Sequence, residues 1–207
     1  MKRRECDRYG NPSSIPVQIA RMSSLQIFLR QVRNRSREHR QAMLLARAGL
    51  AGQMISVLRQ ELDSMVRIIY LLSQGQERRE LLIELSVSGE RWSQDSSRAK
   101  VTDLEMVELA QSLQGWTRSV YKFGCAFIHL SSLHDYNDRD PLAQLPTQER
   151  SDILEHCRHY HGGPSADNSR FADLIPFLPS VFEKIASNLE CYLEALESRE
   201  LRSANEI

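Results

Sequence analysis

The stretch SREHRQAMLLARAGLAGQMISVLRQELDSMVRIIYLLS, residues 36–73, decides the fold. Its apolar side chains recur in alternating steps of four and three residues over four heptads, which is typical of a helix that packs against neighbours. Ser36 suits an N-cap, so we expect one long amphipathic helix from about Arg37 to about Ser73. The seam consists of Leu44, Ala48, Ala51, Ile55, Leu58, Leu62, Met65, Ile69 and Leu72.

The second half of this helix is apolar on more than one side. Val57, Val66, Ile68 and Leu71 lie outside the seam, so neighbours must cover this half from several directions. The first half contains Gly49 and Gly52, which cost helix propensity unless another segment packs closely against them. The stretch therefore predicts the central spine of a bundle.

The remaining chain shows helical spacing and no strand-like alternation. Thr102-Asp103-Leu104-Glu105 forms a capping box, Gly115 separates two helices, and Gly162-Gly163-Pro164 stops another. We expect an all-α, up-and-down bundle of six to seven helices with one long central helix. Residues 1–14 read as a basic N-terminal arm and residues 15–207 as a single domain. The further helices are expected over residues 15–32, 78–85, 102–113, 116–134, 148–161 and from about 179.

Composition narrows the class of protein. A chain of 207 residues with 41% hydrophobic and 26% charged residues is typical of a folded domain. It has no apolar run of the roughly 18 residues that a membrane span needs, and its start lacks an apolar signal core. We therefore expect a cytoplasmic protein with no membrane association, whose four scattered cysteines are reduced thiols. No phosphate-binding glycine loop or glycine-flanked nucleophilic serine is present, so we expect no cofactor.

The zero net charge hides an asymmetry. Residues 1–50 carry a net charge of about +8, and the remainder therefore carries about −8. The basic part could bind an anionic ligand or dock onto the chain's own acidic part. Its densest run could contact RNA phosphates, or it could be a solvated turn between helices. This run contains Arg30, Arg33, Arg35, Arg37 and Arg40.

The segment 116–134 holds the best candidates for chemistry. At helical spacing Arg118, Lys122, Cys125, His129 and Ser132 share one face, joined by Tyr136 if the helix continues, whereas Phe123, Phe127 and Leu130 face the core. Arg118 and Lys122 could hold a phosphodiester while His129 transfers protons, which would cleave RNA through its 2′ hydroxyl without a metal. The alternative is a solvated face paired with acidic residues such as Asp103, Glu105 or Glu108.

The helical layout together with Lys122-Phe-Gly-Cys-Ala-Phe-Ile-His129 resembles the HEPN superfamily, which includes many prokaryotic defence and toxin ribonucleases. The family motif is an Arg followed after four to six residues by a His; here Lys122 stands in place of the Arg. The resemblance implies a homodimer with two His129 side chains facing each other, acting on RNA in an antiviral defence or toxin–antitoxin context. The Lys favours the competing interpretation, a non-catalytic interaction or nucleic-acid-binding protein with a protein partner.

A histidine cluster follows in the next helix. His156 and His159 are three residues apart and could share a zinc ion with Cys157 or His161. The cluster also ends at Gly162, where histidines favour a helix C-terminus through the helix dipole. Because no HExxH or paired CxxC motif accompanies it, we predict no metal site.

Overall fold

The computed structural model describes residues 22–93 and 100–205, so the expected arm at 1–14 lies outside the described residues. Within these ranges the fold is all-α, as expected, with a single isolated bridge between Ser93 and Lys100 and no strand. None of the described helices combines the length and apolarity needed to cross a bilayer. The helices are α1 (Ser24–Ala42), α2 (Ala51–Ser73), α3 (Gln76–Val87), α4 (Asp103–Gln114), α5 (Thr117–Ile128), α6 (Thr147–His161), α7 (Phe171–Leu174) and α8 (Leu178–Asn205).

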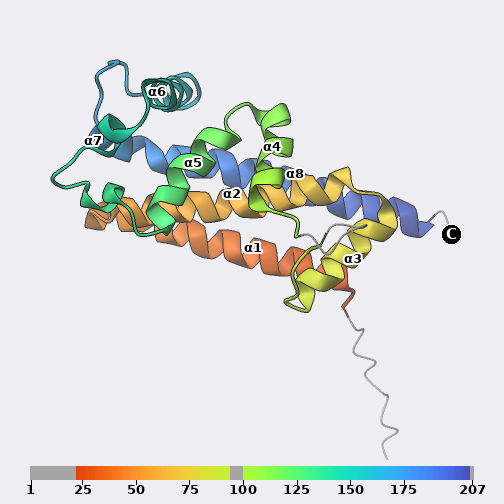
Figure 1. Cartoon of the computed structure of the whole chain (residues 1–207). Coiled ribbons are helices and arrows are strands. Elements are labelled where there is room, and N and C mark those ends of the chain that lie inside the picture. The colour runs from red at the N-terminus through yellow and green to blue at the C-terminus, as the bar shows by residue number, and fades with distance from the viewer. Residues whose placement is uncertain (1–21, 94–99, 206–207) are drawn as a thin grey trace, which may run out of the picture.

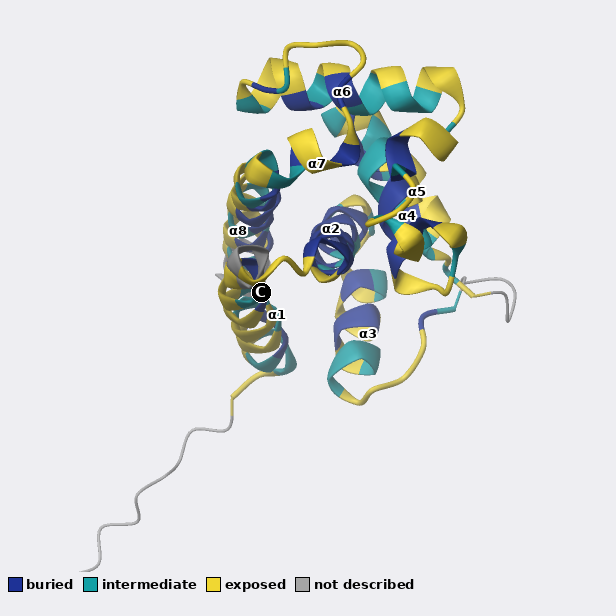
Figure 2. Ribbon diagram, turned by 90° about the vertical axis from the view of Figure 1, so that its left-hand side faces the viewer, coloured by how far each residue is buried: buried dark blue, intermediate teal, exposed yellow. Residues whose placement is uncertain are grey.

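Helix α2 is the centre of the bundle (Figure 1). Viewed along its axis, α1 and α8 cover one side, and α4 and α5 cover the other (Figure 2). Helix α3 lies near the C-terminal end of α2 and packs mainly on α1 (Figure 1). The side chains that widen its apolar stripe, Val57, Val66, Ile68 and Leu71, are all buried. The predicted role of this helix as the spine of the core is therefore confirmed.

The predicted continuous helix from 37 to 73 is wrong. The chain forms the end of α1, a 3₁₀ helix η1 (Met43–Ala48) and then α2, with the break at Gly49, whose φ is +74°. A left-handed residue ends a helix and is adopted readily by glycine. Ser36 lies within α1 and caps nothing; Ser23 is the N-cap, in a capping box with Gln26. The four–three spacing is therefore shared by two elements that the glycine separates.

The basic side of α1 packs on acidic residues of α8. Arg33 lies 2.9 Å from a carboxylate oxygen of Glu190 and 3.1 Å from one of Glu197. One heptad further along, Arg40 lies 3.0 Å from Glu183. For these two arginines, docking onto the chain's own acidic part is the arrangement that the structure adopts.

Several predicted helix ends are confirmed. The Thr102 hydroxyl accepts a hydrogen bond from the Glu105 amide at the start of α4, and Gly115 and Gly162 end α4 and α6 with φ of +75°. The α7 turn and the short 3₁₀ helix η4 (Ile175–Phe177) before α8 were not anticipated.

The expected helix over 116–134 is too long, because α5 ends at Ile128. The Ser131 hydroxyl donates to the Ala126 carbonyl at 2.6 Å and accepts from the Leu133 amide, which starts the 3₁₀ helix η2 (Ser132–Asp135). Serine side chains compete with helical backbone bonds in this way. Ser132 and Tyr136 are consequently not on the α5 face.

Candidate functional site

Helix α5 crosses α2 at unusually short range. A Cβ added at Gly124 would lie 2.6 Å from the Cβ of Arg59, so only glycine fits there without movement. One turn later the Ser56 hydroxyl lies 3.0 Å from the Phe127 carbonyl oxygen. At the start of α2, Gly52 lies beneath the Tyr136 ring, which confirms the close packing expected there. These contacts fix the end of α5 against α2. The expectation of close packing is wrong for Gly49, because among the described residues no atom beyond its chain neighbours lies within 4 Å of its Cβ position.

The two candidate phosphate-holding residues are ion-paired within the chain. Arg118 of α5 forms a two-pronged pair with Glu108 of α4, and its Nε lies 2.9 Å from Oε1. The hydrogen bond from Arg118 lowers the pKa of Glu108 and raises that of Arg118. Lys122 Nζ lies 2.7 Å from Oε1 of Glu149 on α6. Both cationic side chains are about half exposed, so these are surface pairs.

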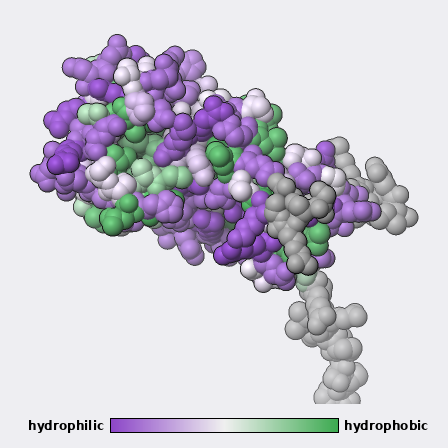
Figure 3. Space-filling view, viewed as in Figure 1, coloured by the Kyte–Doolittle hydropathy of each residue, from purple (hydrophilic) through white to green (hydrophobic). Residues whose placement is uncertain are grey.

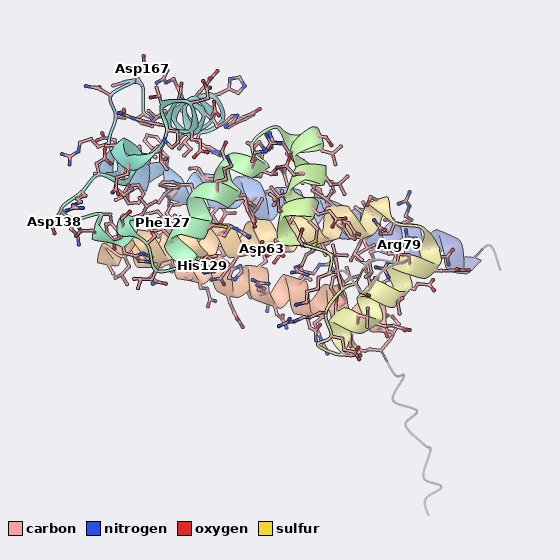
Figure 4. All side chains as sticks on the ribbon, viewed as in Figure 1. Asp63, Arg79, Phe127, His129, Asp138 and Asp167 are labelled. Carbon is pink, nitrogen blue, oxygen red and sulfur yellow. The ribbon has the colours of Figure 1, made fainter. Side chains whose placement is uncertain are left out.

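His129 is not grouped with these cations. It caps the C-terminus of α5 in an extended conformation and is exposed. It lies seven positions after Lys122, which corresponds to about 10 Å along a helix axis. Arg118 and Lys122 share a shallow hollow with Glu149 and Asp152 that His129 does not line. Figure 4 shows His129 at the lower end of α5, beside α2. The structure therefore brings together Arg118 and Lys122, and leaves His129 apart.

Exposed apolar side chains flank His129. Ile128 is 42% exposed and Leu130 is 96% exposed. The expectation that Leu130 faces the core is wrong, because the helix ends before it, whereas Phe123 and Phe127 are buried as expected. At the same end of the bundle, Leu50 caps α2 and is 43% exposed. Figure 3 shows hydrophobic patches at this end of the molecule, over α5 and the chain that follows it.

The arginines of α1 do not form one free basic surface. Arg33 and Arg40 face α8, while Arg37 donates to the Asn34 side chain at 3.2 Å and Arg30 contacts the sulfur of Met22. Arg30, Arg33 and Arg37 line an open groove together with Glu197, and Arg35 lines a separate groove beside Trp92. The predicted RNA-contacting run is thus divided, with Arg30, Arg33 and Arg37 at one groove, Arg35 at another and Arg40 paired with Glu183.

Tyr136 serves packing. It is half-buried, and its ring lies 5.9 Å from that of Phe171 and 6.2 Å from that of Phe127. It therefore does not join His129 on a helical face as the longer helix would have required. His134 is part of the capping box of η2 with Ser131.

The α6 histidines are dispersed. His156 and His161 line a cavity beneath α6, while His159 is exposed and its ring meets that of Tyr160 edge-on at 4.6 Å. Among residues 22–93 and 100–205, no three His, Cys, Asp or Glu side chains are grouped to hold a metal.

Sequence reasoning missed a buried charged cluster beneath α5. Arg59 of α2 is 3% exposed, pairs with Asp63, lies 3.7 Å from Asp103, and stacks 4.0 Å from the centre of the Tyr121 ring. The available signal was Arg59 and Asp63 at i,i+4 spacing inside an apolar helix. Gly124 on α5, against which the aliphatic part of the Arg59 side chain packs, could not be recognised as a contact position from the sequence.

A second buried polar group joins α1 to α2. Glu61 is fully buried and accepts hydrogen bonds from the Ser36 hydroxyl at 2.5 Å and from His39 Nδ1 at 2.7 Å. His39 is itself buried. Because both partners lie on the same face of α1, this group locks one register of α1 on α2.

No family model matches the chain, and neither do the curated proteins or the solved structures with which it was compared. Function is therefore inferred below from the residues and their geometry.

Proposed function

We propose that this chain is a cytoplasmic helical interaction protein that forms a homodimer through the end of the bundle around His129, without cleaving RNA. The observation that carries the proposal is the exposed apolar surface of Ile128 and Leu130, adjoining the end of α2 that carries Leu50. A leucine that is 96% exposed beside other exposed apolar side chains is typical of an interaction surface.

The composition of this segment supports a second copy of the chain as the partner. From Phe123 to His134 the sequence contains no Asp, Glu, Lys or Arg. The centres of protein interfaces are depleted in charge, and a two-fold interface places the same patch against itself. An uncharged apolar patch meets no repulsion when paired with itself.

The ion pairs of the candidate site support the non-catalytic part of the proposal. Glu108 and Glu149 neutralise Arg118 and Lys122, and Asp152 adds a further negative charge to the same hollow. A phosphodiester entering there would have to displace two carboxylates and then lie next to them. Lys122 also lacks the planar, two-pronged grip that Arg has on phosphate.

Metal-independent RNA cleavage is a second candidate, and the position of His129 favours it. The imidazole is exposed at the centre of the proposed interface, so a two-fold dimer would bring two such groups near each other as acid and base. The defence or toxin context that the HEPN resemblance implies belongs to this candidate.

One set of variants tests both. We expect the parent to sediment as a dimer at micromolar concentration, Leu130→Asp to sediment as a monomer, and Leu113→Asp to stay dimeric. Leu113, at the end of α4, is 62% exposed but lies outside the proposed interface, which makes it a matched control. A parent that is monomeric at 100 μM, a concentration chosen about a hundredfold above a micromolar Kd, would rule out the homodimer.

Cleavage is tested by incubating total RNA with the parent, His129→Ala and Lys122→Arg proteins in the presence of a chelator. The proposal expects intact RNA in all three reactions. Degradation by the parent that is abolished in His129→Ala would replace the non-catalytic function with the ribonuclease.

A further inference from the structure

A cavity beneath α6 is separate from the surface around His129. It lies between α6 and the bundle, and Figure 2 shows α6 lying across α5 and α8. Its volume is about 90 Å³. The wall is almost entirely apolar, and its buried side chains include Ile55, Leu58, Trp116, Phe123, Leu178 and Ile185.

The rim of this cavity carries the polar groups. Lys184 of α8 and Tyr160 of α6 line the cavity and are exposed, so they lie where it opens. Lys184 makes no ion pair with a carboxylate of the described chain, whereas Lys122 has Glu149. Burial, assisted by Lys184, lowers the pKa of His161 and favours its neutral form, so the Lys184 ammonium is the cation at the rim.

One residue of the cavity lining carries a polar atom without a partner in the described part of the chain. His156 Nδ1 is buried and has no hydrogen-bond partner among the described residues. Buried polar atoms are nearly always satisfied, by the protein itself, by ordered water or by a bound molecule. A ligand carrying an oxygen could satisfy it.

We infer that this cavity binds a small amphipathic monoanion, a carboxylate attached to an aliphatic chain of about six to eight carbons or to a single aromatic ring. The tail would lie against Trp116 and Phe123, and the carboxylate would pair with Lys184 at the rim. The size follows from the volume, because a water molecule needs roughly 10–15 Å³ of such space and this cavity therefore holds roughly six to nine water-sized spheres.

Helix α6 provides a route of entry. Leu154 and Cys157 are the only buried side chains of α6, which contacts the bundle mainly through α5 and α8. An element with so few buried contacts opens locally at low free energy. The tail can therefore reach the interior without unfolding the core around α2.

The test uses the full chain and Trp116, whose indole lines the cavity, as a fluorescence probe. Sodium octanoate and 1-octanol are titrated in parallel, and the series from butanoate to octanoate is compared. We expect saturable quenching or shift by octanoate, with affinity rising about fourfold for each methylene that enters the cavity. Octanol should bind more weakly, because it lacks the charge that pairs with Lys184.

Three variants separate the contributions. Lys184→Met should lower the octanoate affinity about two- to fivefold, as expected for an ion pair at an exposed lysine, and leave that of octanol unchanged. Lys100→Met, which removes an exposed lysine away from the cavity, should change neither. Ser119→Trp places a ring in the cavity at a half-buried position and should abolish both, with the helical circular dichroism signal retained.

Absence of saturable binding by octanoate at millimolar concentration would overturn the inference, as would equal binding of acid and alcohol that Lys184→Met does not alter. Because Leu130→Asp does not touch this cavity, failure of the dimer would leave the ligand test intact.

Discussion

The crossing of α5 over α2 at Gly124 gives the sharpest prediction, the loss of stability in Gly124→Ala. A methyl group there would lie 2.6 Å from Cβ, 3.0 Å from Cγ and 3.1 Å from Cδ of Arg59. The first of these atoms is fixed to the α2 backbone and cannot rotate away, so the two helices must separate. Overpacking of a core typically costs about 1–3 kcal/mol, and alanine returns about 1 kcal/mol of helix propensity.

Since the clash involves atoms that cannot yield, we take the upper part of that range and expect a net loss of about 1–2 kcal/mol in the free energy of unfolding. The assay is urea unfolding followed by circular dichroism at 222 nm. For a domain of this size the same loss lowers the melting temperature by roughly 2–8 °C.

Gly52→Ala is the matched control. Its methyl group would lie 3.0 Å from Cε1 of Tyr136, an atom at the far end of a side chain that is not fixed to the backbone as a Cβ is. We expect its stability to stay within about 1 kcal/mol of the parent. A Gly124→Ala protein as stable as the parent, or more stable, would refute the claim that this glycine sets the distance between α2 and α5.

Three further predictions concern buried groups. Asp63→Asn should destabilise the protein by about 2–4 kcal/mol, because it leaves the 3%-exposed Arg59 without its nearest anion. As a control, Glu108→Gln breaks a solvent-exposed pair and should leave the urea midpoint unchanged. Equal losses of stability in the two variants would contradict the burial of the Arg59–Asp63 pair. His39→Ala should lower the free energy of unfolding by about 3 kcal/mol, because Glu61 keeps a single partner, whereas Ser36→Ala should lower it by about 1 kcal/mol. The same urea titration measures both losses. The reverse order would show that Ser36 is the main partner of Glu61. Burial raises the pKa of the Cys157 thiol, so less of its thiolate is present at pH 8. Iodoacetamide should therefore modify the exposed Cys191 well before Cys157, and peptide mass spectrometry would follow both reactions. Modification of Cys157 first would place this residue outside the cavity wall.

Local signals in the sequence were sufficient for much of the fold. The buried stripe of α2 follows from its apolar spacing, and the ends of α4 and α6 follow from Thr102, Gly115 and Gly162. The end of α1 could not be predicted in this way, because the apolar spacing continues through η1 and a single left-handed residue, Gly49, interrupts the helix. Spacing records which side chains face the core and carries no information on whether the backbone between them is continuous.

The candidate site was predictable only in part. The spacing correctly placed Arg118 and Lys122 on one side of α5, and Glu108 was among the acidic partners considered. Glu149 was not, because the approach of α6 to α5 depends on contacts between distant parts of the chain. Tyr136 was expected on this face only if the helix continued, and the hydrogen bond from the Ser131 side chain marks the point after Ile128 where it does not.

The arginines of α1 and the glutamates of α8 have a consequence for how the bundle finds its alignment. Arg33 and Arg40 are one heptad apart, and so are Glu183, Glu190 and Glu197. Apolar stripes with a seven-residue period tolerate a slide of one heptad, but such a slide would leave a charge at one end of the row without its counterpart. The same row holds positive charge at short range against negative charge, so its electric field largely cancels a few ångströms from the surface. Arg33 and Arg40 thus select a partner helix within the molecule, and these two paired arginines have little field left to attract a polyanion from solution.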